Sequence, residues 1–409
     1  MIKIAVLGHG IVGSGVCEVV LKNRESIQAK CGREITVKKI LDLREFKDLP
    51  YADCFTKEFK DILEDDEIEI VVEVMGGLSP AYEYVSACLK RGKSVVTSNK
   101  ELVATKGAEL LRVAREHNVN FFFEASVGGG IPIIRPLHQC LAANTISEIV
   151  GILNGTTNYI LTKMIRDAMS FEDALAKAQE LGYAERNPAA DVEGHDTARK
   201  ISILGSLAFG KHISPDRVHT EGITGITLAD IQYAEALGCV IKLIGYTGRT
   251  QDGPIQIMVA PCLISTESQL ARVDDVFNGI LVRGDAIGDV VFYGRGAGKL
   301  PTASAVVADV IDAVKAKGTS KSLYWSEEPA PVLEYETTSA AYFLRIQGDE
   351  ARLKGIAYSI KALKVIETGE HGEIGVTLPS VDQKQLETIV SEVKNQGAEV
   401  RCMIRMLDC

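Results

Sequence analysis

The sequence is poor in the features that mark secreted, membrane-spanning and metal-binding chains. Its nine cysteines show no C-x-x-C pair and no regular spacing, so they indicate reduced thiols and exclude a disulfide framework or a zinc site. No apolar run reaches the ~18 residues that a membrane-spanning helix needs. We expect no signal peptide, because MIKIAVLGHG enters a strand at once. These absences predict a cytoplasmic protein with no membrane partner.

An excess of basic residues is also missing. Lysine and arginine number 45 against 55 acidic residues, which gives a net charge of −10 and a pI near 5.4. This balance argues against a nucleic-acid partner and against an anionic membrane surface. The 409 residues are 46% hydrophobic and 24% charged, which is typical of a globular protein with two or three domains.

The first motif is a glycine turn between an apolar run at 3–7 and a segment with helical periodicity. Strand, G-x-G-x-x-G and helix together predict a dinucleotide site. The first glycine allows the tight turn, the second lets the backbone approach the pyrophosphate, and the third lets helix and strand pack closely. The helix N-terminus offers N–H groups to the phosphates. The residues expected to bind the cofactor here are Gly8, Gly10, Ile11, Val12 and Gly13.

The second predicted strand, 35–41, ends at Asp42. An acid at this position usually binds the adenosine ribose hydroxyls and favours NAD. Basic side chains nearby could instead accept the 2′-phosphate of NADP, so the residues leave NAD and NADP both open. These bases are Lys38, Lys39, Arg44 and Lys47.

Two further segments of the first 135 residues carry candidate functional groups. A strand at 94–97 leads into Thr97-Ser98-Asn99-Lys100, at the edge where cofactor and substrate should meet. Three glycines at 128–130 indicate either a hinge or backbone packed against a ligand or ion. Alternating strands and helices over 1–135 predict a doubly wound parallel α/β domain.

Beyond residue 135 the pattern changes to an α+β domain over 136–299. There an acidic loop runs into a helix that carries Asp196 and Lys200 four residues apart, on one face. Such a pair is ordinarily a solvated surface ion pair. A returning segment, 300–325, is expected to join the first domain through an apolar helix at 303–314. A linker at 329–331 then precedes a β-α-β-β-α-β pattern over 335–409 that is ferredoxin-like, with a capping box expected at Ser380 and Gln383.

Taken together, these motifs resemble homoserine dehydrogenase over about 1–325, with an ACT-like segment at 335–409. The motifs are G-H-G-I-V-G at 8–13, V-V-T-S-N-K at 95–100, E-A-S-V-G-G-G-I-P at 124–132, N-G-T-T-N-Y-I at 154–160, L-G-Y-A-E at 181–185, D-V-E-G-H-D-T-A-R-K at 191–200 and G-R-G-A-G at 294–298. The resemblance implies interconversion of L-homoserine and L-aspartate 4-semialdehyde with NAD or NADP, on the route to threonine, methionine and isoleucine.

The resemblance also implies roles for individual residues. Lys200 would move the proton at the substrate oxygen, and the carboxylates would hold the substrate ammonium group, which attracts anions. The expected substrate-binding residues are Glu185, Asp191, Asp196 and Lys100; further cofactor contacts are Thr97, Lys100 and Gly296; and the main-chain carbonyls of Glu124, Val127, Gly129 and Ile131 resemble a sodium site. His195 has no assigned role. A homodimer or homotetramer is expected.

Three alternatives remain beside this interpretation. The ACT-like segment lacks the D-x-P-G turn of regulatory ACT domains, since Gly348-Asp349-Glu350 stands there, so threonine binding is open and the segment could serve only in assembly. A phosphorylating semialdehyde dehydrogenase would need an activated cysteine with a histidine partner, and Cys88 and Cys140 have apolar or helical surroundings. A non-catalytic Rossmann-plus-ACT sensor would not need the cluster around Lys200.

Overall fold

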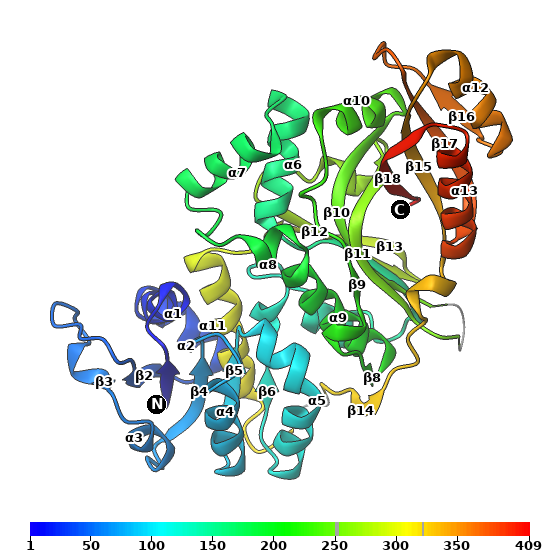
Figure 1. The fold of residues 1–409 in the computed structure, drawn as a ribbon. Helices are drawn as coiled ribbons and strands as arrows, with labels where there is room; N and C mark the ends of the chain where they lie inside the picture. Colours follow the sequence, from blue (N-terminus) through cyan, green and yellow to red (C-terminus); the bar gives the residue numbers. More distant parts are fainter. Residues whose placement is uncertain (250–252, 321–322) are drawn as a thin grey trace.

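The computed structural model describes residues 1–249, 253–320 and 323–409. Its N-terminal part and its C-terminal segment lie at opposite ends of the molecule, with the sheet and helices of residues 146–295 between them (Figure 1). No helix within the described ranges is long and apolar enough to cross a membrane.

The first sheet has six strands in the order β3-β2-β1-β4-β5-β6, and every neighbouring pair is parallel. The strands are β1 (Ile2–Leu7), β2 (Ile35–Leu41), β3 (Phe55–Thr56), β4 (Ile68–Glu73), β5 (Ser94–Thr97) and β6 (Phe121–Phe122). The strand order reverses between β1 and β4. Ligands of such sheets bind beyond the carboxyl ends of the strands at this point. The predicted doubly wound parallel sheet is confirmed.

Helices cover both faces of this sheet. They are α1 (Ile11–Lys22), α2 (Arg24–Cys31), α3 (Lys60–Leu63), α4 (Ala81–Lys90), α5 (Lys100–Glu116) and α11 (Lys299–Lys315). The apolar helix expected at 303–314 is α11, and it lies directly against α1. A Cβ on Gly15 would come within 2.8 Å of the Lys299 carbonyl oxygen and 3.0 Å of the Ala303 Cβ. Residues 321–322 of the expected returning segment lie outside the described residues.

The second sheet runs in the order β13-β12-β7-β10-β11-β18-β15-β17-β16, with β9 beside β11. Its strands are β7 (Ile146–Ile152), β9 (His219–Thr220), β10 (Cys239–Gly248), β11 (Gln256–Ser265), β12 (Phe277–Gly284), β13 (Gly288–Arg295), β15 (Ser339–Gln347), β16 (Lys364–Ile366), β17 (Glu373–Asp382) and β18 (Glu399–Leu407). The helices of this half are α6 (Gly155–Asp167), α7 (Phe171–Glu180), α8 (Ala189–Val192), α9 (His195–Phe209) and α10 (Leu228–Ala236).

Helix α9 crosses one face of this second sheet at close range. A Cβ on Gly245 of β10 would meet the side chains of Thr197 and Ile201 at 3.0 and 3.3 Å. Ile201 and Leu204 of the helix are fully buried. The close packing fixes the position of α9, and therefore of the residues at its N-terminus, relative to the end of β7.

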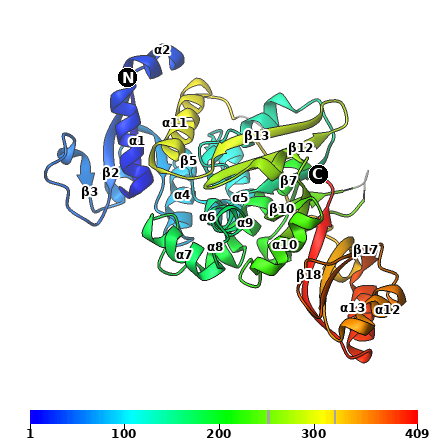
Figure 2. The ribbon, with the colours of Figure 1, turned by 90° about the horizontal axis from the view of Figure 1, so that it is seen from above.

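The C-terminal segment has the expected β-α-β-β-α-β order, with α12 (Glu350–Ser359) and α13 (Gln383–Asn395) as its helices. It projects away from the N-terminal six-stranded sheet (Figure 2). Its sheet is nevertheless continuous with that of the middle domain, because β18 pairs in parallel with β11 at Cys262 and Arg405. The sequence carried no sign of this connection.

One local expectation for this region is wrong. The capping box of α13 is formed by Asp382 and Gln385, because Ser380 still belongs to β17. The segment expected as a linker at 329–331 is partly a strand. Here β14 (Ser326–Pro329) pairs with β8 (Lys211–His212), and the next residues bridge to Ile255.

Candidate functional site

The glycine turn after β1 has the shape that a pyrophosphate needs. Gly8 adopts a φ of 95°, and a Cβ on Gly13 would lie 2.0 Å from the Gly8 carbonyl oxygen, so neither position tolerates a side chain. At Gly10, by contrast, no described heavy atom lies within 4 Å of the Cβ position. The turn therefore packs tightly on the protein side and leaves open space in front of the N-terminus of α1. This space suits the pyrophosphate of a bound dinucleotide.

Asp42 stands at the end of β2, where the adenosine ribose of a dinucleotide would lie. Its carboxylate accepts hydrogen bonds from the His9 amide at 2.8 Å and from the Arg44 Nη2 at 2.9 Å. Hydrogen bonding to Arg44 holds the pKa of Asp42 well below its usual range. A cavity of ≈ 610 Å³ opens beside the pair and is also lined by Lys47 and Lys57. Acidic and basic groups are thus both available at this end of the site.

The carboxyl ends of β4 and β5 are tied together by a buried carboxylate that the sequence analysis missed. Glu73 is fully buried and accepts hydrogen bonds from the Thr97 Oγ1 at 2.6 Å and the Met75 amide at 2.8 Å. Burial raises the pKa of Glu73. The Thr97 hydroxyl is thus bound to Glu73 within the protein. The contact of Thr97 with a cofactor stays a prediction. An acid at the end of a buried strand was the available signal for Glu73.

Asn99 directs the next residue, Lys100, toward the middle domain. The Asn99 Oδ1 accepts from the Leu102 amide at 3.1 Å and so caps α5, while its Nδ2 donates to the Gly77 carbonyl oxygen at 2.6 Å. Lys100 is the first residue of α5, and its Nζ forms an ion pair with Asp196 of α9. This ion pair joins the N-terminal domain to the middle domain.

The Asp196–Lys200 pair at the start of α9 is buried. The Lys200 Nζ lies 2.8 Å from the Asp196 Oδ2 and donates to the Leu153 carbonyl oxygen at 2.7 Å. The two residues are only 2% and 8% exposed. This pair is therefore not the solvated surface pair that its spacing alone would indicate. The Leu153 carbonyl lies just after β7, so α9 and the end of the second sheet hold the amine together.

Asn154 links the two carboxylates of this cluster. Its Nδ2 donates to the Asp191 Oδ1 at 2.7 Å and to the Asp196 Oδ2 at 2.9 Å. Its Oδ1 accepts from the Thr157 amide at 2.9 Å and so caps α6. We call Lys100, Asn154, Asp191, Asp196 and Lys200 the lysine–aspartate cluster. No role for Asn154 was predicted from the sequence, although an asparagine directly before a helix is a recognisable cap.

Burial and neighbouring charges shift the pKa values of the two lysines in opposite directions. Burial lowers the pKa of Lys200, and the charge of Lys100 adds to this effect while Asp196 opposes it. Burial would also lower the pKa of Lys100, but Asp196 outweighs it, so that pKa is raised. Burial disfavours the charge of Asp196 as well, yet the two lysines hold its pKa far below the usual range. Lys200 is therefore the amine that gives up its proton more readily.

Asp191 differs from its neighbour Asp196. Burial raises its pKa, and the negative charge of Asp196 raises it further. Its carboxylate is partly exposed and takes one hydrogen bond from Asn154. An incoming cation would relieve both effects, because it would stabilise the charged carboxylate.

Glu185 does not belong to the cluster. Within the described residues its side chain is exposed and makes no hydrogen bond or ion pair with Asp191, Asp196 or either lysine. His195 is likewise exposed, and its Nε2 lies 3.3 Å from Glu193. The structure thus brings Lys100, Asp191, Asp196 and Lys200 together and leaves Glu185 at the rim.

The glycine-rich segment at 124–131 packs backbone against backbone. The buried Glu124 carboxylate accepts from the Ile133 amide at 2.6 Å and the Ile134 amide at 2.8 Å. Gly129 has a φ of 56°, and a Cβ there would lie 2.2 Å from the Gly296 carbonyl oxygen. A Cβ on Gly296 would in turn lie 2.1 Å from the Asn278 Nδ2. The roles of this segment toward sodium, and of Gly296 toward the cofactor, stay predictions.

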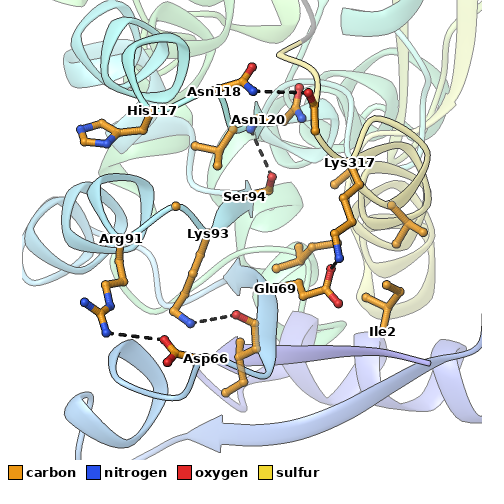
Figure 3. Close-up of a pocket in the computed structure, with 17 residues that line it drawn as sticks. Ile2, Asp66, Glu69, Arg91, Lys93, Ser94, His117, Asn118, Asn120 and Lys317 are labelled. Atoms are coloured by element: carbon orange, nitrogen blue, oxygen red, sulfur yellow. Dashed lines mark hydrogen bonds and ion pairs between the residues drawn. The ribbon is translucent and has the colours of Figure 1, made fainter.

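A separate cavity of ≈ 350 Å³ lies at the amino ends of β1, β4 and β5, on the opposite edge of the sheet from the lysine–aspartate cluster. Figure 3 shows its lining, including Glu69, Lys93 and Lys317. Its polar groups bind one another. The Lys93 Nζ donates to the carbonyl oxygens of Asp65 and Ile68 at 2.6 and 2.8 Å, and Lys317 pairs with Glu69 at 2.5 Å. This cavity is no extension of the cofactor site.

Comparison with known proteins identifies the family. The homoserine dehydrogenase family model matches residues 132–311, and the model of the homoserine dehydrogenase NAD-binding domain matches residues 8–124. The chain is 39% identical to a homoserine dehydrogenase of Pseudomonas aeruginosa over 94% of this chain and 89% of that protein. The chain belongs to the homoserine dehydrogenase family. It therefore interconverts L-homoserine and L-aspartate 4-semialdehyde with NAD(P) in amino-acid biosynthesis.

Solved homoserine dehydrogenases share all or most of this architecture. A structure from Thiobacillus denitrificans is 37% identical, with a TM-score of 0.93 over 100% of this chain and 98% of that chain. A hyperthermophilic archaeal homoserine dehydrogenase, described in complex with NADPH, covers 76% of this chain and 97% of its own with a TM-score of 0.66 and 28% identity.

The family assignment removes the two alternative functions. The thioester-forming enzyme would need a reactive thiolate, but burial raises the pKa of the Cys88 thiol to about 12. A non-catalytic sensor does not explain why Lys200 is buried between Asp196 and a main-chain carbonyl. Both observations agree with a homoserine dehydrogenase.

Proposed function

We propose that Lys200 moves the proton of the substrate hydroxyl in this homoserine dehydrogenase. The observation that carries the proposal is the burial of Lys200 against one carboxylate and one carbonyl. A neutral amine has two N–H bonds, which match these two acceptors, and a lone pair that remains for the hydroxyl proton. The lowered pKa of Lys200 favours this neutral form.

The reaction divides between the cofactor and the cluster. NAD(P)⁺, when bound at the glycine turn, supplies the hydride acceptor. As the substrate C–H bond gives up its hydride, the O–H bond breaks and its proton passes to the Lys200 amine. The product is the aldehyde. In the reverse direction the Lys200 ammonium returns the proton. Asp196 stabilises this ammonium, and Lys100 stays charged beside the substrate.

Carboxylates at the entrance would hold the substrate ammonium group. Asp191 is best suited, because burial and the charge of Asp196 raise its pKa, and a bound ammonium group would offset both effects. Glu185 would join it from the rim. Asp196 acts indirectly, since its two oxygens already bind Lys100, Lys200 and Asn154. Its role is to hold the two lysines in place.

For the adenosine end we propose that both cofactors are accepted. Asp42 would bind the ribose hydroxyls of NAD, whereas Arg44, released from Asp42, would bind the 2′-phosphate of NADP together with Lys47 or Lys57. The mixed lining of the cavity at Asp42 supports this dual use.

We also propose a main-chain sodium site, a homo-oligomeric assembly and a cytoplasmic location. Carbonyl oxygens are ligands that hard cations accept, and those of Glu124, Val127, Gly129 and Ile131 fall within one short buried segment. Within the described residues no group of three or more His, Cys, Asp or Glu side chains is placed to hold a metal. The proposed sodium site therefore uses main-chain oxygens. A homodimer or homotetramer in the cytoplasm is proposed from the family resemblance and the nine free cysteines.

The test is homoserine oxidation followed by NAD(P)H absorbance, with NAD⁺ and NADP⁺ supplied separately. L-Serine and L-threonine serve as control substrates with the same amino-acid group and a hydroxyl at a different position. Homoserine-dependent reduction of either cofactor is expected, with little signal from the controls. Absence of homoserine-dependent reduction with both cofactors would refute the assigned chemistry.

A further inference from the structure

The C-terminal segment reaches the middle domain through a buried arginine of β18. Arg405 is 5% exposed, and its Nη1 and Nη2 donate to the two carboxylate oxygens of Glu221 at 2.7 and 2.8 Å. Its guanidinium also lies 5.1 Å and 5.5 Å from the ring centres of Tyr335 and Tyr342. A bidentate pair of this kind fixes the direction of the carboxylate as well as its charge.

Glu221 is held from its other sides too. The His219 Nε2 lies 2.6 Å from the Glu221 Oε1, and the His219 ring stacks on Tyr335 at 3.4 Å between ring centres. The Glu221 amide donates to the Val259 carbonyl oxygen of β11 at 2.7 Å. Burial would raise the pKa of Glu221, but hydrogen bonds from Arg405 and His219 outweigh it and lower that pKa to about 2. The Glu221 carboxylate stays charged, and hydrogen bonds fix both the backbone and the side chain of this residue.

The residues around Glu221 lie directly against the turn between Asp191 and Asp196. The Ile223 amide donates to the Val192 carbonyl oxygen at 2.9 Å. A Cβ on Gly222 would lie 2.3 Å from the same oxygen and 2.7 Å from the Glu193 Cα. A Cβ on Gly194 would lie 3.3 Å from the Glu221 carbonyl oxygen. Two stretches of backbone, 221–223 and 192–194, therefore touch without side chains between them.

We propose that Arg405 is a positioning residue for the substrate site. Through Glu221 it holds 221–223 in place, and that segment holds 192–194, which carries Asp191 on one side and Asp196 on the other. The C-terminal segment thus completes the substrate site of its own chain, in addition to any role in assembly or regulation. This inference rests on the proposed substrate role of Asp191.

The contact predicts a selective kinetic effect. Without the Arg405–Glu221 pair, 192–194 loses its support, so Asp191 is held less firmly for the substrate ammonium group. The cofactor turn at 8–13 lies in the other domain and has no part in this contact. Homoserine binding should therefore weaken while cofactor binding stays the same.

The experiment uses the full-length enzyme with Arg405→Gln, Glu221→Gln and the double variant. Arg401→Gln is the matched control, because Arg401 lies on the same strand but binds Gln347 and Glu399 at the surface. Each single variant is expected to raise the homoserine KM about fivefold or more, at the lower end of typical coupling between sites. The NADP⁺ KM should change less than about twofold. The double variant should be no worse than either single one, because both remove the same contact.

Hydrogen exchange of the peptide covering 189–199 gives a readout that is independent of activity. Faster exchange is expected there in Arg405→Gln and Glu221→Gln, and wild-type exchange in Arg401→Gln. Arg405→Lys serves if the glutamine variants fail to fold, since it keeps the charge but loses the bidentate geometry. An intermediate rise in the homoserine KM is then expected.

The proposal is overturned if Arg405→Gln and Glu221→Gln, or Arg405→Lys in their place, match Arg401→Gln in both homoserine KM and exchange. A parallel Asp191→Asn variant separates this failure from the failure of the substrate assignment. If Asp191→Asn leaves the homoserine KM unchanged, the substrate role of Asp191 is wrong. If it raises that KM while the Arg405 variants do not, only the positioning role is wrong.

Discussion

The glycine turn and the lysine–aspartate cluster are built in different ways. The turn consists of six consecutive residues, 8–13, and acts through its backbone and the space around it. The cluster joins Lys100, the 153–154 corner and the 191–200 segment, and acts through buried side chains. A local backbone shape needs particular residue types at fixed spacing, whereas a buried charge cluster needs the completed fold. The first can be recognised from sequence alone; the second needs either a structure or a known relative.

The two lysines of the cluster extend this comparison to chemistry. Both bind Asp196, yet the Lys100 side chain is 42% exposed and that of Lys200 only 10%. The pKa is raised for Lys100 and lowered for Lys200, because burial dominates only at the second. We therefore propose different roles for two identical residue types on one carboxylate: Lys100 as a fixed charge and Lys200 as the proton carrier.

Removing the proton carrier should have the largest effect. Lys200→Ala is expected to lower kcat for homoserine oxidation by about 10²- to 10⁴-fold, the usual contribution of a general acid or base. NADPH binding, followed by fluorescence titration, should remain within about twofold, because the turn is a separate structure. Turnover close to that of wild type would contradict the assignment.

Asn154→Ala tests how the cluster is held together. It removes hydrogen bonds to the carboxylates of Asp191 and Asp196, which should raise the homoserine KM about tenfold or more, since hydrogen bonds to charged groups are worth about 1.5–3 kcal/mol. It also removes the cap of α6, so thermal unfolding should be measured beside the kinetics. A lower Tm with an unchanged homoserine KM would restrict Asn154 to a purely structural role.

Two alanine substitutions test whether the glycines of the turn serve packing or cofactor binding. Gly13→Ala places a Cβ 2.0 Å from the Gly8 carbonyl oxygen, and should lower the free energy of unfolding by about 1–3 kcal/mol. Gly10→Ala meets open space, so its free energy of unfolding should change by less than about 1 kcal/mol while the affinity for NADPH falls. Equal effects of the two variants on stability would refute the division between packing and binding glycines.

Much of the nucleotide-binding half is predictable because its signals are local. Apolar runs, the glycine turn and the periodicity of α11 identify their elements directly. The pairing of β18 with β11 joins residues far apart in sequence and has no local signal. The Leu153 carbonyl that binds Lys200 is a main-chain group, so no residue type reveals it. The error at Ser380 arose because two residues of β17 follow it before the helix begins.

The smallest expected effect concerns the cofactor. Arg44→Ala should raise the NADP⁺ KM about threefold to tenfold, because one exposed charge-assisted contact to the 2′-phosphate is lost. The NAD⁺ KM should fall or stay constant, since Asp42 is freed for the ribose hydroxyls. Comparing kcat/KM for both cofactors checks this, and an equal loss with NAD⁺ would contradict the proposed division of roles.

The most direct measurement is the pH dependence of kcat/KM for homoserine oxidation in wild type and Lys100→Met. Oxidation needs the neutral Lys200 amine, so the rate should rise with pH through the Lys200 pKa, below the ordinary lysine value. The charge of Lys100 helps to lower that pKa, so its removal should move the rising limb to higher pH, whatever the loss in absolute rate. A limb that stays at the same pH, or moves to lower pH, would contradict the account of Lys200 as the proton carrier.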